Sequence, residues 1–148
     1  MVITHTYQET VACGKKFART LQAQDVVVLT GALGAGKTTF VQGVLEGFRL
    51  TCPALSPTFT LIRQYHASHA KLDIYHVDLY RIEAGDVSGI GLDDYLYSPR
   101  SITLIEWGEK IIESLPRYIQ VSFSFQGPAQ HRHIKFLQKG FKRAMAIG

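Results

Sequence analysis

The sequence predicts one α/β domain over residues 1–148, built on a mixed, partly antiparallel sheet. The run VVVLT at 26–30 is short, continuous and β-branched, which is typical of a strand covered on both faces. Helical and strand patterns alternate in the first half of the chain, and strand patterns dominate the second half. The length fits one ordinary domain, and no repeat or interdomain linker interrupts it.

The first part of the chain predicts a helix that faces the core, followed by the buried strand. We expect Thr10 to cap this helix, because the apolar side chains of Cys13, Phe17 and Leu21 follow it at a spacing of four residues. The pattern ends near residues 24–25, just before VVVLT.

The rest of the chain predicts a second helix and five more strands. The helix is expected from about Lys37 toward Gly47, and the Pro-rich stretch TCPALSPT after it marks a loop. FTLIRQYH and KLDIYHVDL predict a hairpin joined by ASHA. Residues 101–107 contain ITLIEW, an apolar strand that ends in an acid, and YIQVSFSF and HIKFL predict a final strand pair.

Composition favours a cytoplasmic protein with no membrane segment. No run of about 18 apolar residues is present, and MVITHTYQET lacks the basic-then-apolar order of a secretion signal. Cys13 and Cys52 lie far apart without a CxxC pair, which argues against a disulfide framework or structural zinc, and we interpret them as buried free thiols.

Charge is distributed unevenly along the chain. Nine of the twelve acids lie between Asp73 and Glu113, whereas residues 131–148 carry five Lys or Arg and no acid. This basic end is interpreted as a solvated face, with contact to tRNA phosphates or to an acidic partner surface as the alternatives.

A phosphate-binding motif follows the buried strand directly. GALGAGKTTF at 31–40 satisfies G-x-x-x-x-G-K-[ST] through Gly31, Gly36, Lys37 and Thr38. The glycines let backbone N–H groups point at phosphate oxygens, Lys37 reaches the β- and γ-phosphates, and Thr38 offers a hydroxyl to Mg²⁺. Strand, loop and helix together predict a P-loop NTPase-like three-layer sandwich. No N/TKxD segment is present, which favours ATP over GTP.

Such a site also needs an acid at a strand end to hold the metal. Asp78 ends the strand in YHVDLYR, and Glu106 ends the strand ITLIE. Both acids have an alternative role as solvated or ion-paired side chains, with Arg81 close to Asp78 in sequence.

Three further stretches, SPTFTL at 56–61, HVDLYR at 76–81 and LIEWGE at 104–109, accompany GALGAGKTTF. In this order and at these separations, the four motifs resemble the TsaE (YjeE) family of small bacterial P-loop ATPases, over roughly residues 8–135. The resemblance implies an ATP hydrolase that acts with TsaB and TsaD in making threonylcarbamoyladenosine, the modified adenosine next to the anticodon of tRNAs that read codons beginning with A. ATP hydrolysis would reset the complex between turnovers, and tRNA would be contacted indirectly or weakly.

The resemblance also implies roles for individual residues. It places Thr38 and Glu106 on Mg²⁺, makes Thr58 a switch residue facing the γ-phosphate, and makes Asp78 a catalytic acid or one that acts one step from the metal. The ATP phosphates would be held by Leu33, Gly34, Ala35, Gly36, Lys37, Thr38 and Thr39, and the nucleotide would be contacted away from the metal by Thr10 and Arg132.

Three features leave alternatives open. Trp107 is typical of the family, or it packs in the core; His76 orients Asp78, or it packs. The tail at 138–148 matches no family pattern.

Two other functions use the same loop. A small-molecule kinase would need an Arg-bearing lid, whereas Arg49, Arg63 and Arg81 are scattered. A nucleotide-dependent binding module would use ATP only to order the SPTF loop for docking.

Overall fold

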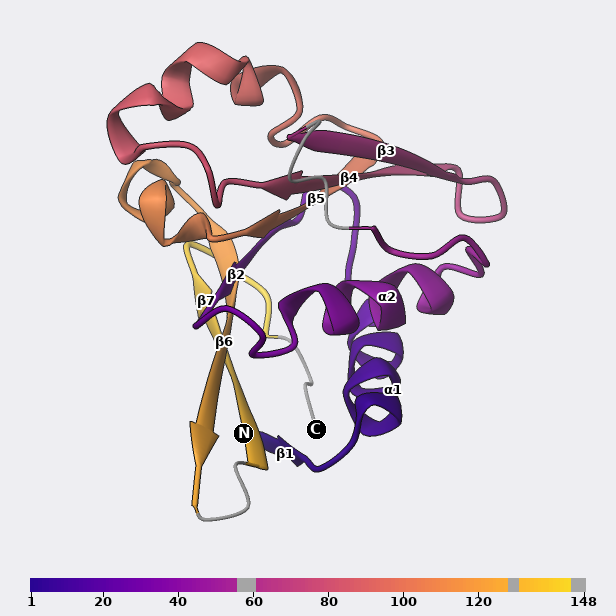
Figure 1. The fold of residues 1–148 in the computed structure, drawn as a ribbon. Coiled ribbons are helices and arrows are strands. Elements are labelled where there is room, and N and C mark those ends of the chain that lie inside the picture. Colours follow the sequence, from indigo (N-terminus) through magenta and orange to yellow (C-terminus); the bar gives the residue numbers. More distant parts are fainter. Residues whose placement is uncertain (56–60, 128–130, 145–148) are drawn as a thin grey trace.

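The structure is a computed structural model that describes residues 1–55, 61–127 and 131–144 (Figure 1). Thr58, the expected switch residue, lies outside the described residues. A seven-stranded sheet has the order β1-β7-β6-β2-β5-β4-β3. Its strands are β1 (Val2–Thr4), β2 (Val26–Thr30), β3 (Ile62–Ala67), β4 (Leu72–Asp78), β5 (Ser101–Glu106), β6 (Tyr118–Gln126) and β7 (His131–Lys139).

The sheet is parallel at its centre and antiparallel at both sides, which confirms the mixed sheet. β2 pairs in parallel with β5 and β6, and β4 pairs in parallel with β5. The predicted hairpin is β3–β4, and the predicted final pair is β6–β7, both antiparallel. β1 pairs with β7 and was not expected, because three residues carry too short a pattern to be recognised.

Helix α1 (Tyr7–Ala18) begins and ends earlier than the sequence suggests. The cap is Thr6, which has an extended backbone and accepts from the Glu9 N–H, so the prediction of Thr10 as cap is wrong. The prediction that the helix continues to residues 24–25 is also wrong, since it ends at Ala18. Helix α2 (Lys37–Gly47) has the bounds that the sequence predicts.

The two α-helices approach closely through glycine. A Cβ on Gly14 would lie 2.2 Å from the Phe40 carbonyl oxygen, and one on Gly43 would lie 2.0 Å from that of Val11. Both distances are shorter than any real Cβ contact, so a larger residue at either position would push the helices apart.

The sheet separates two cores, in agreement with the three predicted layers. Alternate side chains of β2, such as Val27 and Leu29, pack under α1 and α2, whereas Val26 and Val28 pack on the other face. That second face is covered by short 3₁₀ helices rather than α-helices: η1 (Ala84–Ile90), η2 (Leu92–Asp94), η3 (Gly108–Lys110) and η4 (Ile112–Ser114) (Figure 1).

The start of the basic tail is packed against the domain. Phe141 contacts the core under the α-helices, and Arg143 forms an ion pair with Asp25, whose side chain is buried. Arg143 therefore is not part of a solvated face, although Lys135, Lys139 and Lys142 are exposed.

Two expectations from composition have simple outcomes. Cys13 and Cys52 are free, as expected, but both are only half-buried. Burial raises the pKa of the Cys13 thiol. In the described ranges no helix is both long enough and apolar enough to cross a membrane.

Candidate nucleotide-binding site

A cavity of about 260 Å³ lies where the central parallel strands end. In the strand register Glu106 lies opposite Leu29 on one side and Asp78 on the other, so β2, β4 and β5 end together. Such an edge is where ligands bind in open α/β sheets. The cavity is lined by Leu33, Gly34, Ala35, Gly36, Lys37, Thr38, Thr39, Asp78, Tyr80, Glu106, Trp107 and Arg132.

The loop between β2 and α2 has the backbone of a phosphate cradle. Gly31 has a φ of 136°, and a Cβ there would lie 2.5 Å from the Phe123 carbonyl oxygen, so only glycine fits. Gly36, at the N-cap of α2, is left-handed with a φ of 104°. The free N–H groups of the first turn of α2 thus face the cavity side of the loop, where they favour an anion.

Lys37 lies inside the loop that it is expected to serve. Its ammonium donates to the carbonyl oxygens of Gly31 and Ala32 at 2.6 and 2.9 Å, and it lies 3.9 Å from the centre of the Trp107 ring. Burial lowers the pKa of Lys37, and the carboxylates of Glu106, Glu109 and Asp78 act in the opposite direction. The cation is therefore held next to the cavity.

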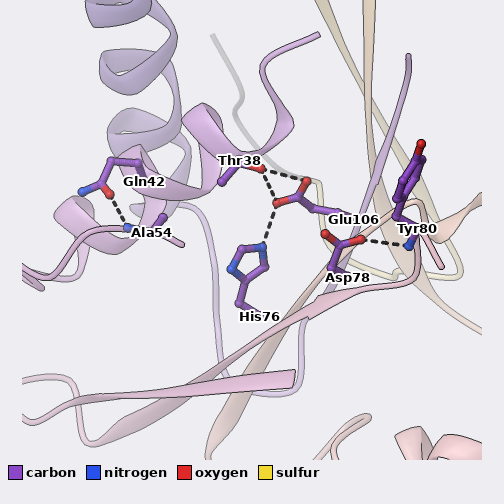
Figure 2. Close-up of polar contacts among 7 residues, drawn as sticks. All are labelled: Thr38, Gln42, Ala54, His76, Asp78, Tyr80 and Glu106. Carbon is purple, nitrogen blue, oxygen red and sulfur yellow. Dashed lines mark hydrogen bonds and ion pairs between the residues drawn. The ribbon is translucent and has the colours of Figure 1, made fainter. Parts of the chain in front are cut away.

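Thr38 and Glu106 meet across the cavity floor (Figure 2). The Thr38 hydroxyl lies 2.8 and 3.0 Å from the two carboxylate oxygens of Glu106, which is 3% exposed. A hydroxyl and a carboxylate are oxygen ligands of the kind that Mg²⁺ prefers, so the donor set fits this ion. The described residues hold no cluster of three or more His, Cys, Asp or Glu. A metal here would need its remaining ligands from phosphate and water.

His76 orients Glu106 rather than Asp78. Its Nε2 lies 2.8 Å from Glu106 Oε1, and the ring is fully buried (Figure 2). An ionised carboxylate only accepts, so the ring donates this hydrogen bond. The alternation along β4 explains the contact, because His76 and Ile74 point to the α2 side of the sheet, as Leu104 and Glu106 do on β5.

Asp78 and Tyr80 form the opposite side of the cavity. Asp78 is 3% exposed, and its Oδ1 accepts from the Tyr80 N–H at 2.8 Å (Figure 2). The Tyr80 ring packs on Trp107 with centroids 4.9 Å apart. The chain just after Asp78 is held by Lys110, which donates to the carbonyl oxygens of Leu79, Tyr80 and Ile82 at 2.7, 2.9 and 2.7 Å.

The remaining predicted residues fall into two groups. Arg132 on β7 lines the cavity, and a Cβ on Gly36 would lie 3.1 Å from its Nε. Thr10 does not line the cavity: it is fully buried behind Gly36, and its hydroxyl contacts Thr4 and the Thr6 carbonyl oxygen. Thr10 therefore supports the loop from behind.

Sequence reasoning missed Tyr80 and left Trp107 undecided. Both line the cavity, so Trp107 is not an ordinary core residue. Trp107 also has a left-handed backbone with a φ of 59°, which is uncommon for an aromatic residue. HVDLYR contains Tyr80 and was the available signal for it.

One further contact ties α2 to the loop that leads toward residues 56–60. Gln42 lies one helical turn after Thr38, and its Oε1 accepts from the Ala54 N–H (Figure 2). The segment before SPTF therefore begins from an anchored point on α2.

The chain matches the family model described as "Threonylcarbamoyl adenosine biosynthesis protein TsaE" over residues 4–134. The chain belongs to the TsaE family. A role in tRNA threonylcarbamoyladenosine biosynthesis follows from this membership, and the match covers nearly the range that the four motifs suggest.

Individual TsaE proteins are similar over most of their length. A protein from Nostoc sp. named "tRNA threonylcarbamoyladenosine biosynthesis protein TsaE" is 39% identical over 121 residues, which covers 80% of this chain and 74% of the relative. A protein of the same name from Treponema pallidum is 39% identical, with 78% and 84% covered. The crystal structure of YdiB from Bacillus subtilis shares the fold, with a TM-score of 0.75, 34% identity, and 91% and 82% of the two chains covered.

The contact between His76 and Glu106 gives a stability prediction. His76→Ala removes a buried ring and one donor from a buried carboxylate, so we expect the free energy of unfolding to fall by about 2–4 kcal/mol. Urea denaturation measures this change.

His66→Ala is the matched control, because His66 also lies 2.8 Å from a carboxylate, that of Asp73, but its side chain is 64% exposed. The control should change the free energy of unfolding by about 0.5 kcal/mol or less. Equal effects of the two substitutions would contradict the proposed structural role of His76.

Proposed function

We propose that this TsaE-family chain hydrolyses ATP with Mg²⁺, and that it does so with TsaB and TsaD to support threonylcarbamoylation of tRNA. The observation that carries the proposal is the convergence of Lys37, Thr38 and Glu106 at the end of the phosphate loop. These are a cation for phosphate, a hydroxyl for Mg²⁺ and a strand-end acid, the parts that P-loop ATPases share.

The chain's own groups divide the work as follows. The loop N–H groups and the Lys37 ammonium hold the phosphates, and Lys37 exchanges its two carbonyl acceptors for phosphate oxygens. Thr38 and Glu106 hold Mg²⁺, which neutralises charge on the phosphates. Asp78 lies one strand from Glu106, close enough to act on groups around the metal.

The isolated chain has few groups to stabilise the transition state. In the described part of the chain, Arg132 is the one arginine that lines the cavity, and it lies beside Gly36. A partner that supplies or orders further groups commonly raises the rate of P-loop hydrolysis. We therefore assign to TsaB and TsaD the role of completing the site, and ATP turnover would reset their complex.

This proposal predicts slow hydrolysis by the isolated protein. Addition of TsaB and TsaD should raise the rate of phosphate release by about 10-fold or more, because partner-supplied groups contribute that much in related chemistry. Thr58→Ala should reduce this increase more than it reduces ATP affinity, since a switch residue acts when the loop closes on the γ-phosphate. Phosphate release and calorimetric ATP titration measure the two quantities.

Cells provide the second arm. Depletion of the protein should leave tRNA without threonylcarbamoyladenosine while its other modified nucleosides persist, as measured by mass spectrometry of digested tRNA. An unchanged level of this nucleoside, in cells with no substitute ATPase, would contradict the proposed function.

A further inference from the structure

A second hollow lies on the sheet face opposite α1 and α2. It is a groove of about 570 Å³ between η1–η2 on one side and η3–η4 on the other. Figure 1 shows these segments, pink and orange, on the same side of the sheet. The floor is apolar and formed by Val87, Leu92 and Ile111, and the exposed rim carries Asp93, Glu109 and Glu113. We call this hollow the acidic groove.

The negative charge of the acidic groove is not neutralised from within. Its one lining cation among the described residues is Lys110, whose ammonium already donates to three backbone carbonyl oxygens. Asp93, Glu109 and Glu113 form no ion pair within the described ranges. An uncompensated acidic rim above an apolar floor is complementary to a segment with basic and apolar side chains.

The glycine at the edge of the groove is a second observation. A Cβ on Gly85 would meet nothing within 4 Å, and its φ is not left-handed, so no contact inside the chain requires glycine there. Glycine costs about 0.5–1 kcal/mol relative to alanine in regular structure, so its use needs a reason. Its effect here is to keep the groove wall low, which permits the close approach of another backbone.

The acidic groove is linked to the nucleotide site through η3. Trp107 lines the nucleotide cavity, and Glu109 and Lys110 line the groove two and three residues later. Lys110 also holds the carbonyl oxygens of Leu79 and Tyr80, which directly follow Asp78. A segment seated in the groove would therefore touch the support of the nucleotide site.

We propose that the acidic groove docks a basic segment of a partner protein, with apolar side chains on the floor and Lys or Arg at the rim. The inference rests on the proposed function, because it identifies where the TsaB–TsaD complex binds this chain. The same charge that attracts a basic peptide repels phosphate, so the groove is a protein-docking site and not a tRNA site.

Charge reversal tests the rim. The double variant Asp93→Lys with Glu113→Lys should bind the purified TsaB–TsaD complex at least about 10-fold more weakly than the unaltered chain, with a flatter dependence on salt. Glu9→Lys with Asp73→Lys makes the same charge change outside the groove and should leave the affinity within about 3-fold. Calorimetric titration at several salt concentrations measures both.

Steric filling tests the groove independently of charge. Gly85→Leu should fold normally and bind ATP as before, because its side chain enters open space, yet it should weaken binding of TsaB–TsaD by about 10-fold or more. Gly89→Leu is the matched control, since a Cβ there also meets nothing within 4 Å and Gly89 does not line the groove.

The outcomes separate the two proposals. If the unaltered chain binds TsaB–TsaD and the groove variants bind equally well, the groove is not the docking site and the function stands. If the unaltered chain does not bind the complex at low salt, the proposed function fails and the assignment of the groove fails with it.

Discussion

Lys37→Ala is expected to abolish ATP hydrolysis while the fold is retained. The rate should fall by about 10³-fold or more, which is the scale on which a charge that stabilises the transferring phosphoryl group contributes. Affinity for ATP should fall as well, because the ammonium that lies over the loop is the cation nearest the phosphates. Phosphate release and calorimetry measure these two changes.

The fold should survive because the contacts of Lys37 are local. Its ammonium bonds only to carbonyl oxygens of its own loop, and its removal relieves the cost of holding a charge in a buried place. Lys135→Ala is the matched control, since it removes the same side chain from an exposed position on β7. Loss of the circular dichroism signal in Lys37→Ala, or turnover at the level of the control, would contradict the assignment.

The second large effect should separate the two strand-end acids. Glu106→Gln is expected to remove most of the increase in ATP affinity that Mg²⁺ confers, by about 10-fold or more, because Glu106 is the carboxylate in contact with Thr38. Asp78→Asn should retain that increase and instead lower the rate, since the printed contact of Asp78 is with the Tyr80 backbone.

ATP titrations with Mg²⁺ and with a chelator measure the difference directly. The two variants are controls for each other, because each replaces a buried strand-end carboxylate with its amide. If Asp78→Asn loses the dependence on Mg²⁺ and Glu106→Gln keeps it, the roles of the two acids are the reverse of those proposed.

Local pattern was sufficient where the interactions are local. The run VVVLT, the glycines after it and the helix from Lys37 specify a strand, a loop and a helix within about 20 residues, so each follows from neighbouring side chains. The hairpin β3–β4 and the pair β6–β7 also follow, because short links leave few other pairings.

Local pattern failed where a backbone angle decides. Thr6 and Thr10 are both reasonable caps by residue type, and the cap is the one whose backbone is extended and whose oxygen reaches the Glu9 N–H. Thr10 is instead buried against the phosphate loop by the packing of α1 on the sheet.

What the sequence by itself determined, then, is the phosphate loop, the chain order of the strands and, through four motifs in register, the TsaE family. Only the tertiary structure decided that β4 lies beside β5, which brings His76, Asp78 and Glu106 to Thr38. It also decided that β7 carries Arg132 to Gly36 and that two 3₁₀ segments enclose an acidic groove. The physical reason is that periodicity reports which face of an element is buried, whereas the partner that buries it is set by pairing across long sequence separations.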